Sequence, residues 1–431
     1  MTRTHIGSKW FVVIALVLLL PAIAFARGEA EEVAEDQLNM VIGDWAVDVL
    51  EDFILEYGES RGIEIGMEGY PFDQLFETIE IRQQAEARDI DVIFVDGPVT
   101  ANYAERGFIL PLDDYFTRGE MEELWSDASI GAGSVDGRFF SAPLNNSSQV
   151  LYYNRDLLER AGVEFPSADI EDRWTWEQIV EAAQKVDALG DDIAGFQFDQ
   201  VNRYYQLQPL PEGLGGGDGI GEDGLADLTN PGWIEAFQWY QNLYGEWGIA
   251  RRGTSPAETP ELFAAGRTGF FVGGLWNIRA NFQDVEDLNY GVAPHPYFAD
   301  GVPVTPTGSW HVGIWSHTRN PDAAADFVRW MTASIDIAEY WLEGHGQFPA
   351  HVDLLEKIQT DEQFAEQPLI AYRIAAYEAE NTAVPRAATP GFFEFERGLN
   401  EAIEDIRNGV DVETALSDAE ARINRALRRY Q

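Results

Sequence analysis

The side chains that could do chemistry in this chain are its carboxylates, aromatic rings and amides. Asp and Glu number 74 in 431 residues, against 29 Lys and Arg, 6 His and no Cys. The histidines lack the spacing of metal ligands, and the chain has no HExxH motif, no GxxxxGK(S/T) loop and no GxSxG elbow. Carboxylates occur along the whole sequence, so a glycosidase pair remains open. From the missing motifs we expect that the protein has no metal site and no cofactor and that it is not an enzyme.

Aromatic and amide side chains indicate binding chemistry instead. The chain has 13 Trp. An aromatic face fits the apolar C–H face of a sugar, while Asn, Gln and Asp hydrogen-bond to its hydroxyl groups. Trp45 follows the apolar run Leu38–Ile42, which we interpret as a first strand leading to a helix near Val47. Loops at the carboxyl ends of strands hold ligands in open α/β sheets, so Trp45 is either a ligand platform or a core residue.

A glycine-rich segment, Gly215–Gly224, contains the spacing GxGxxG from Gly219 onward. A dinucleotide fingerprint needs a strand before the motif and a helix directly after it, and neither is predicted here. The segment also lacks the glutamate that ends a calcium-binding loop. We expect a turn-rich surface loop.

The elements that must position these residues follow an α/β pattern, most clearly from Phe139 to Val186. A strand is predicted at Val150–Tyr153, followed by a short helix ending at Gly162. A second helix begins at Thr175, where Gln178 completes a capping box. Alternating strands and helices of this kind are typical of α/β domains.

Other segments show equally local patterns. Apolar residues predict strands at Ile63–Ile65, before a turn at Gly69–Phe72, and at Asp91–Val95. The alternation in Gly195–Gln200 predicts a strand with its polar face outward. Helices are predicted at Gln74–Ala87, after the Asn230 cap with a buried stripe of Trp233, Phe237, Tyr240 and Tyr244, after Asn320, and in two amphipathic segments covering Phe395–Ile406 and Val412–Leu427.

Several motifs resemble a known family. They are Tyr153-Asn154 followed by a charged pair and Leu157-Leu158, then Ala161-Gly162, Pro166 and Thr175-Trp176-Glu177. A strand ending Gly274-Leu275-Trp276 is similar to the family's Gly-Pro-Trp, with Leu in place of Pro. The chain thus resembles the family 1 extracellular solute-binding proteins of ABC importers, which include the maltose-binding protein. Gly346–His351 also resembles a family motif, although His351 replaces its Arg.

This resemblance implies an α/β fold of the type II periplasmic-binding-protein kind. It has two α/β lobes joined by crossover hinge segments, with the ligand between them. Lobe 1 would comprise residues 37–143 and 307–350, and lobe 2 would comprise residues 144–306 and 351–431. The first crossover would lie at Pro143–Ser148.

The resemblance also implies ligand-binding residues. Trp276 would stack on a sugar ring, and Asn145 and Asn146 would lie near the hinge and cleft floor. Alternatives remain for Asp96, which could cap a helix, and for Phe393, which could pack in the core. The complete set of candidates is Trp45, Asp96, Gly97, Asn145, Asn146, Gln197, Asp199, Tyr204, Trp276, Trp310 and Phe393.

The N-terminal segment and the charge of the chain indicate where the protein is located. Arg3 and Lys9, an apolar core and Ala24-Phe25-Ala26 predict a signal peptide at residues 1–26, followed by a flexible acidic lead-in at 27–36. The apolar run is shorter than the roughly 20 residues of a membrane span. No Cys is present for a lipid anchor. A formal charge of −45 excludes nucleic acid as a partner and favours a halophilic or salt-tolerant source.

Together these features predict a periplasmic component of an ABC importer that carries a mono- or oligosaccharide to an inner-membrane permease. We expect a monomer. The alternatives are the same role with a polyol, glycerol-phosphate or peptide ligand, or a secreted carbohydrate-active enzyme.

Overall fold

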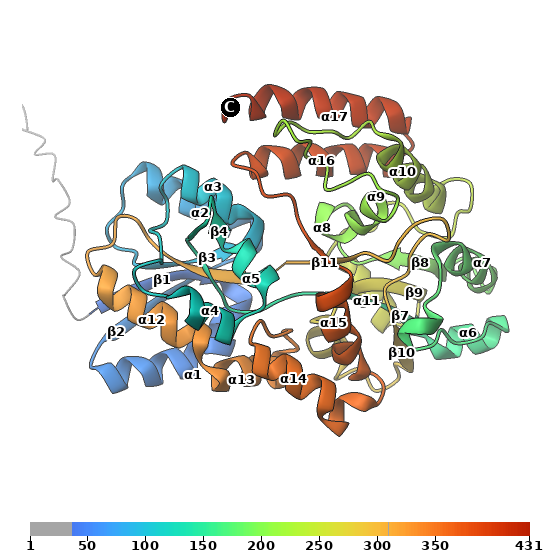
Figure 1. Ribbon diagram of the computed structural model, residues 1–431. Coiled ribbons are helices and arrows are strands. Elements are labelled where there is room, and N and C mark those ends of the chain that lie inside the picture. Colours follow the sequence, from blue (N-terminus) through green and yellow to red (C-terminus); the bar gives the residue numbers. More distant parts are fainter. Residues whose placement is uncertain (1–36, 309) are drawn as a thin grey trace, which may run out of the picture. The chain divides into compact units, whose positions relative to one another are not determined.

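The computed structural model describes residues 37–308 and 310–431, and Figure 1 shows its helices and strands. The predicted signal peptide (1–26) and acidic lead-in (27–36) lie outside the described residues. Helices flank two main sheets. None of the helices in the described part of the chain has both the length and the apolar character needed to cross a bilayer.

The first sheet has five strands in the order β2–β1–β3–β12–β6. Their bounds are β1 Gln37–Gly43, β2 Glu64–Tyr70, β3 Val92–Asp96, β6 Ala142–Pro143 and β12 Trp310–Ile314. Strand β1 is parallel to β2 and β3, whereas β12 is antiparallel to β3 and β6. Helices α1 and α2 connect the three parallel strands, which need crossover connections.

Helices on the first sheet bury its apolar residues on both faces. In β3, Val92 to Val95 have no exposed surface, as expected for a strand covered on two sides. The helices that contribute to this core are α1 Asp44–Arg61, α2 Phe72–Gln84, α3 Thr100–Glu105, α4 Arg118–Leu124, α5 Asp127–Ala132, α12 Pro321–Ala333 and α13 Ile335–His345. A small hairpin of β4 Ser134–Val135 and β5 Arg138–Phe139 lies beside them.

The second sheet has four strands in the order β10–β7–β9–β8. Their bounds are β7 Gln149–Asn154, β8 Ala194–Phe198, β9 Thr268–Gly274 and β10 Tyr290–Ala293. Strands β8 and β9 are parallel, and β7 is antiparallel to both β9 and β10. The period of two in β7 divides its side chains between two cores: Leu151 and Tyr153 enter one, and Val150 and Tyr152 enter the other.

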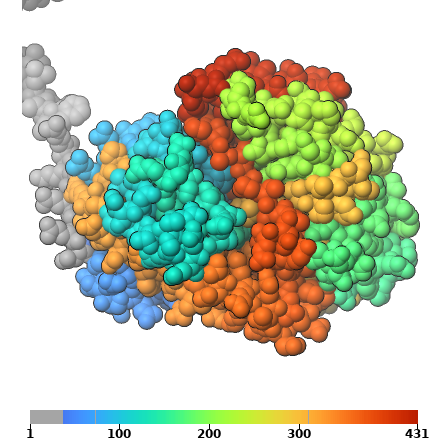
Figure 2. Space-filling view, in the orientation of Figure 1, coloured from blue at the N-terminus to red at the C-terminus, as the bar shows by residue number. Residues whose placement is uncertain are grey.

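Two groups of helices cover the faces of the second sheet. One group consists of α6 Arg155–Ala161, α7 Trp176–Asp187, α8 Tyr204–Leu207, α9 Pro209–Gly213, α10 Pro231–Tyr244, α16 Phe392–Arg407 and α17 Val412–Leu427. The other consists of α11 Glu258–Ala264, α14 Val352–Thr360 and α15 Ile370–Asn381. The C-terminal pair α16 and α17 packs on α10, as the red and yellow-green atoms in Figure 2 illustrate.

The chain passes between the two sheets at several places. Residues 144–148 link β6 to β7, and the short strands β11 (Thr305–Thr307) and β13 (Ala383–Pro385) pair in parallel between the sheets. An isolated bridge joins Ser147 to Gly308. More than one segment of the chain therefore connects the two sheets.

Most local predictions are confirmed. Gly162 ends α6 in the left-handed conformation, and both bonds of the Thr175–Gln178 capping box are formed at the start of α7. Asn230 caps α10 through the N–H of Trp233. Asn320 precedes α12 but makes no capping bond with its side chain.

Three local predictions are wrong. Helix α1 begins at Asp44, ahead of Val47. Strand β2 continues through Gly69 and Tyr70, where a turn is predicted, because pairing with β1 holds these residues extended. The polar side of β8 does not face outward, since Gln197 is 1% exposed beneath the second group of helices. Neither amide atom of Gln197 has a hydrogen-bond partner in the described part of the chain.

Candidate functional site

A cavity of about 520 Å³ lies where the two sheets present their strand ends, and we call it the central cleft. On the first sheet, Trp45 follows β1, and Asp96 ends β3. Trp310 begins the antiparallel strand β12 directly opposite Asp96. Carboxyl ends of strands therefore form this wall of the cleft, as is typical of ligand sites in open α/β sheets.

The second sheet contributes its strand ends in the same way. Asp199 follows β8, and Trp276 comes two residues after the parallel strand β9. Ser147 precedes β7, whose antiparallel direction brings its start to the same edge. The remaining residues that line the cleft include Phe72, Asn145, Gln200, Arg203, Tyr205, Asn277, Asn281, Trp341, His345, Gln347, Arg386 and Glu396.

Aromatic rings make up the wall on the side of the first sheet. The ring of Trp45 lies 5.3 Å from that of Trp310 and 6.0 Å from that of Trp341, measured between centroids. Phe72 meets Trp310 edge-on at 5.9 Å. Across the cleft, the rings of Tyr205 and Trp276 lie 6.3 Å apart. Large rigid aromatic surfaces thus face the cavity from both sides.

Glycine makes room for the two tryptophans that follow strands. Gly43 stands two residues before Trp45, and Gly274 stands two residues before Trp276. A Cβ atom at either glycine would overlap the indole ring of its tryptophan. Each ring therefore folds back over the end of its own strand, and a side chain at the glycine would displace it.

A buried carboxylate lies on the side of the second sheet. Asp199 is 3% exposed and accepts a hydrogen bond of 3.0 Å from Nδ2 of Asn277. Burial raises the pKa of Asp199 to about 6, although the bond from Asn277 opposes that rise. Asn277 is itself fixed by a second bond of 3.0 Å to the carbonyl of Gly274. The cleft thus holds an acceptor whose charge changes near pH 6.

Asp96 and Arg386 form a buried ion pair at the cleft. Both oxygens of the carboxylate accept from the guanidinium, one of them from Nη1 at 2.8 Å. Their side chains are 8% and 7% exposed. The guanidinium also lies over the Tyr205 ring at 5.2 Å, and Nη1 is 3.8 Å from Glu396. Asp96 does not cap the following helix.

Amides hold the crossover segment in place. Asn145 donates from Nδ2 to Oε1 of Gln347 at 2.8 Å, and its Oδ1 accepts from the N–H of Trp310 at 2.9 Å. The Tyr205 hydroxyl donates to Oγ of Ser147 at 2.9 Å. Since each bond joins a crossover residue to a residue distant in sequence, the cleft floor is held by the tertiary fold.

The structure brings six of the predicted site residues together in the cleft. They are Trp45, Asp96, Asn145, Asp199, Trp276 and Trp310.

Five predicted site residues do not line the central cleft. Gly97 is buried at the start of a short 3-10 helix, and Asn146 accepts from Thr307 inside the crossover. Gln197 is buried within β8. Tyr204 is also buried, and its hydroxyl donates a hydrogen bond to the carbonyl of Asp218. Phe393 lines a second hollow, which borders the central cleft between α2 and α16.

Sequence reasoning missed several residues of the cleft. Tyr205 adjoins the predicted Tyr204, and only the start of α8 decides which of the two rings faces the cavity. Arg386 and Trp341 belong to late segments that carry no recognisable local pattern. Asn277 follows the predicted Trp276 directly, so the loop after β9 was the one available signal.

The arrangement suits non-covalent capture. The described residues contain no group of three or more His, Cys, Asp or Glu placed to hold a metal ion. His345 borders the cleft, and burial lowers its pKa. Paired charges, fixed amides and opposed aromatic rings can hold a small polar molecule with an apolar face.

Comparison with solved structures supports the same fold. The structure aligns with an ABC substrate-binding protein of Listeria monocytogenes, solved in complex with cycloalternan, at a TM-score of 0.78 and 20% identity. The alignment covers 91% of this chain and 99% of that one. This likeness confirms the predicted type II periplasmic-binding-protein fold.

Sequence relatives point the same way. The sn-glycerol-3-phosphate-binding periplasmic protein of Brucella melitensis is 26% identical over 312 residues, which is 68% of each chain. The maltodextrin-binding protein of Bacillus subtilis is 24% identical over 364 residues, covering 79% of this chain and 82% of that protein. The chain spans 58% of the length of three Brucella binding proteins that it matches at 26% identity.

The family itself follows from a direct match. The sequence model of the bacterial extracellular solute-binding proteins matches residues 43–334, which is more than half of the chain. The matched range includes the strand ends that build both walls of the cleft. This chain therefore belongs to the bacterial extracellular solute-binding protein family.

Proposed function

We propose that this protein is the substrate-binding component of an ABC importer and that it captures a neutral carbohydrate in the central cleft. The observation that carries the proposal is the pair of opposed aromatic walls with hydrogen-bonding groups between them. Trp45 and Trp310 face the cavity from one sheet, and Trp276 and Tyr205 from the other. A sugar ring has apolar C–H faces and a polar rim, which match this arrangement.

The charges of the cleft favour a neutral ligand. The Arg386 guanidinium is neutralised by Asp96, so an anionic ligand would have to displace a buried carboxylate. Asp199 and Glu396 add two further carboxyl groups to the lining, against one further guanidinium, that of Arg203. Glycerol phosphate, a polyol and a peptide are the alternative ligands, and of these an uncharged polyol fits the charges best.

We propose no enzymatic activity for the site. Both oxygens of Asp96 accept from Arg386, and Asp199 accepts from Asn277. A glycosidase needs one carboxyl group free to give a proton and another free to act as a base or nucleophile. These two carboxylates are engaged with protein donors, which supports capture over hydrolysis.

We further propose the division into lobes at 37–143 with 307–350, and at 144–306 with 351–431. Ligand would favour a closed arrangement by contacting both lobes at once. An N-terminal signal peptide would deliver a free, monomeric protein to the periplasm, where the closed form would dock on the permease. The formal charge of −45 supports a salt-rich setting, since counterions screen an acidic surface.

Thermal-shift measurements over monosaccharides, oligosaccharides, polyols and glycerol 3-phosphate test the proposal, with product analysis of the same samples. We expect a rise in Tm with at least one uncharged sugar or polyol and no new product. Hydrolysis of the sugar would overturn the proposal. Stabilisation by glycerol 3-phosphate alone would replace its neutral ligand by an anionic one.

A matched pair of tryptophan variants locates the binding site. Trp276→Ala should weaken binding by about 1–3 kcal/mol, the usual cost of removing an aromatic anchor. Trp247→Ala removes a half-buried tryptophan that packs beside Trp239 outside the cleft, and it should leave affinity unchanged. Equal affinity in both variants would show that the ligand binds elsewhere.

A further inference from the structure

A chain of side-chain hydrogen bonds lies in the central cleft on the side of the second sheet, and we call it the relay. It consists of Asp199, Asn277 and Asn281, which all line the cleft. Asn277 donates from Nδ2 to Oδ2 of Asp199 at 3.0 Å, and Asn281 donates from Nδ2 to Oδ1 of Asn277 at 2.7 Å. Asn277 has no exposed surface, whereas Asn281 is exposed. The relay thus leads from a buried carboxyl group to the surface of the cleft.

The acceptors fix the direction of each amide in the relay. The second amide hydrogen of Asn277 goes to the carbonyl of Gly274, also at 3.0 Å, and a backbone carbonyl can only accept. Oδ1 of Asn277 must therefore point away from Gly274 and toward Asn281. Because Oδ1 is an acceptor, Asn281 must turn its amide nitrogen toward it. This direction does not depend on the charge of Asp199, since the Gly274 carbonyl accepts at every pH.

The carbonyl oxygen of Asn281 is consequently left for the cleft. This oxygen and the second N–H of the amide make no hydrogen bond within the part of the chain that the structure describes. An asparagine amide without partners adopts a broad range of χ2 angles. Because Asn277 holds the nitrogen, Oδ1 of Asn281 keeps one orientation and presents a fixed acceptor to a bound molecule.

The backbone around the relay is shaped to hold it. A Cβ atom at Gly273 would lie 2.9 Å from Cβ of Asp199 and 3.1 Å from Nδ2 of Asn277, so only glycine lets β9 pass this close to both. Directly after Asn277, a short π-helix covers Ile278–Phe282. Such turns are rare and occur frequently at functional sites. This one places Asn281 one turn beyond Asn277, at the edge of the cleft.

The buried end of the relay is held from a third direction. Thr259 of α11 has no exposed surface, and its Oγ1 lies 3.5 Å from Oδ1 of Asp199 while it donates to the carbonyl of Pro256 at 2.9 Å. Gln200, the residue after Asp199, has a φ of 47°, in the left-handed region that disfavours side chains other than glycine. Strained backbone of this kind persists where the surrounding structure enforces it.

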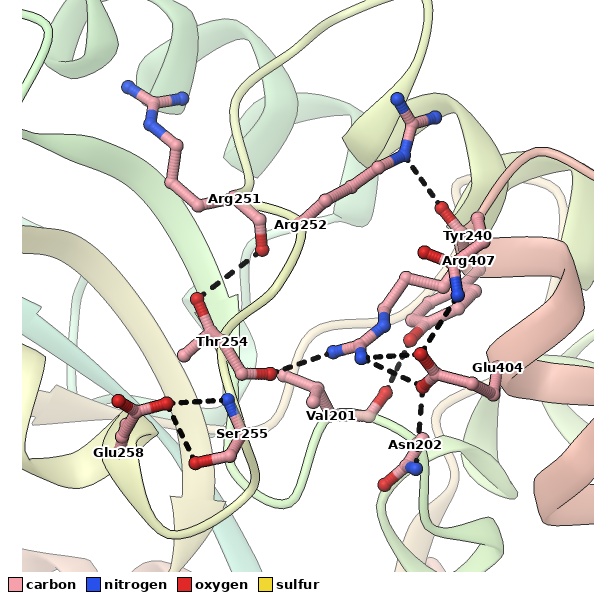
Figure 3. A network of polar contacts seen from close by, with 11 residues as sticks. Val201, Asn202, Tyr240, Arg251, Arg252, Thr254, Ser255, Glu258, Glu404 and Arg407 are labelled. Carbon is pink, nitrogen blue, oxygen red and sulfur yellow. Dashed lines mark hydrogen bonds and ion pairs between the residues drawn. The ribbon is translucent and has the colours of Figure 1, made fainter.

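Figure 3 shows how the segments on either side of Asp199 are enforced. Asn202 donates to Glu404 of α16 at 3.4 Å, and Glu404 pairs with Arg407 at 2.7 Å. Arg407 donates from Nη1 to the carbonyl of Thr254 at 3.0 Å. The segment after β8 and the segment before α11 are therefore both tied to α16, and the relay is in place before a ligand arrives.

We infer that Asn281 determines ligand specificity by accepting a hydrogen bond from one hydroxyl group of the bound sugar or polyol, and that Asn277 is the positioning residue that directs its Oδ1 to that hydroxyl. The inference rests on the proposed carbohydrate-binding function. Stacking on Trp276 recognises the face of a sugar ring but not the position of a hydroxyl on it. Asn281, five residues after that tryptophan, supplies the missing positional information.

A double-mutant cycle tests the relay. Calorimetric titration uses whichever of glucose, galactose, mannose, xylose, maltose, cellobiose and ribitol binds the unsubstituted protein most tightly. Asn281→Ala should weaken binding about three- to tenfold, as the loss of one hydrogen bond predicts. Asn277→Ala should weaken it to a similar degree, because Asn281 loses the acceptor that orients it. The double variant should bind no more weakly than Asn281→Ala alone.

Three outcomes of the cycle count against the inference. Unchanged affinity in Asn281→Ala would overturn it and leave carbohydrate binding intact. Losses that multiply in the double variant would show that Asn277 does not act through Asn281. Failure of all seven compounds to bind would reject the proposed function together with the inference. Asn281 is exposed, so its variant tests the contact even if Asn277→Ala does not fold.

Monofluoro derivatives of the same compound identify the hydroxyl group. A fluorine atom cannot donate a hydrogen bond, so at one position it should weaken binding to the unsubstituted protein about three- to tenfold. That penalty should disappear in Asn281→Ala and in Asn277→Ala, whereas a purely structural change would weaken all derivatives equally. Asn289→Ala, at an exposed position outside the cleft where the side chain donates to Asp156, should keep the affinity and the penalty. A penalty that persists at every position in Asn281→Ala would refute the contact.

Discussion

Replacing Asp96 by Asn tests the buried ion pair that crosses the site. The substitution keeps the shape of the side chain and removes its charge. The Arg386 side chain is only 7% exposed, and in the variant residue 96 would offer it one hydrogen-bond acceptor instead of two. The remaining carboxylate nearby would be that of Glu396, 3.8 Å from Nη1. The variant therefore isolates the cost of leaving a buried cation without its main partner.

The magnitude follows from burial. Removing one member of a buried ion pair costs about 3–5 kcal/mol, because the remaining charge stays desolvated. Glu396 offsets part of this loss, which places Asp96→Asn near the lower end of that range. Arg386→Met should lower the free energy of unfolding by a similar amount, because the buried Asp96 would lose its partner. The double variant should recover most of the loss, since Met can pack on the Tyr205 and Phe392 rings that the guanidinium now covers.

Urea unfolding, followed by tryptophan fluorescence and far-UV circular dichroism, measures all four proteins of the cycle. If both signals change at the same urea concentrations, unfolding is two-state and one free energy of unfolding describes each protein. The costs should persist in molar salt, because screening acts on exposed charges far more than on buried ones. Single-variant losses below about 1 kcal/mol, or losses that vanish in salt, would place the pair in the class of solvated surface pairs and refute this reasoning.

Three further predictions concern the cleft and the second sheet. Gly274→Ala should displace the Trp276 ring and weaken sugar binding about tenfold, as calorimetry on this variant would reveal. Burial raises the pKa of Asp199 to about 6, so the folded state holds a proton that the unfolded state releases near pH 4. This residue should therefore lower the free energy of unfolding by up to about 3 kcal/mol as pH rises from 4 to 7, and the fall measured for Asp199→Asn should be smaller by that amount. Burial likewise raises the pKa of Glu378 to about 7 against the pull of Arg173, 2.8 Å away. Glu378→Gln should consequently cost less at pH 8 than at pH 5, by up to about 3 kcal/mol, because only the unsubstituted protein must hold a buried ionised carboxylate at pH 8. Equal urea-unfolding losses at the two pH values would contradict this.

Local structure was largely predictable, because it depends on residues close in sequence. The bonds between Thr175 and Gln178 span three residues, and the left-handed end of α6 needs only Gly162. The apolar stripes of α16 and α17 follow the helical period, and their residues are buried as predicted. Strand β3 was recognisable from its continuous apolar run.

Predictions failed where a partner element overrode a local pattern. Gly69 and Tyr70 resemble a turn in isolation, yet pairing with Ile42 and Gly43 keeps them in β2. Gln197 alternates with apolar neighbours as a half-exposed strand would, yet helices cover both faces of the second sheet. A single sequence carries no record of such distant coverage.

The sequence by itself determined the α/β elements and the family. It also indicated that Trp45 and Trp276 follow the ends of strands, because a strand end and a glycine two residues before a tryptophan are local features. Only the tertiary structure decided which side chains share the site. Asp96 and Arg386 are 290 residues apart, and Asn145 and Gln347 are 202 apart. Contacts over such separations depend on how the two sheets and their crossover segments pack, so no spacing along the chain could have predicted them.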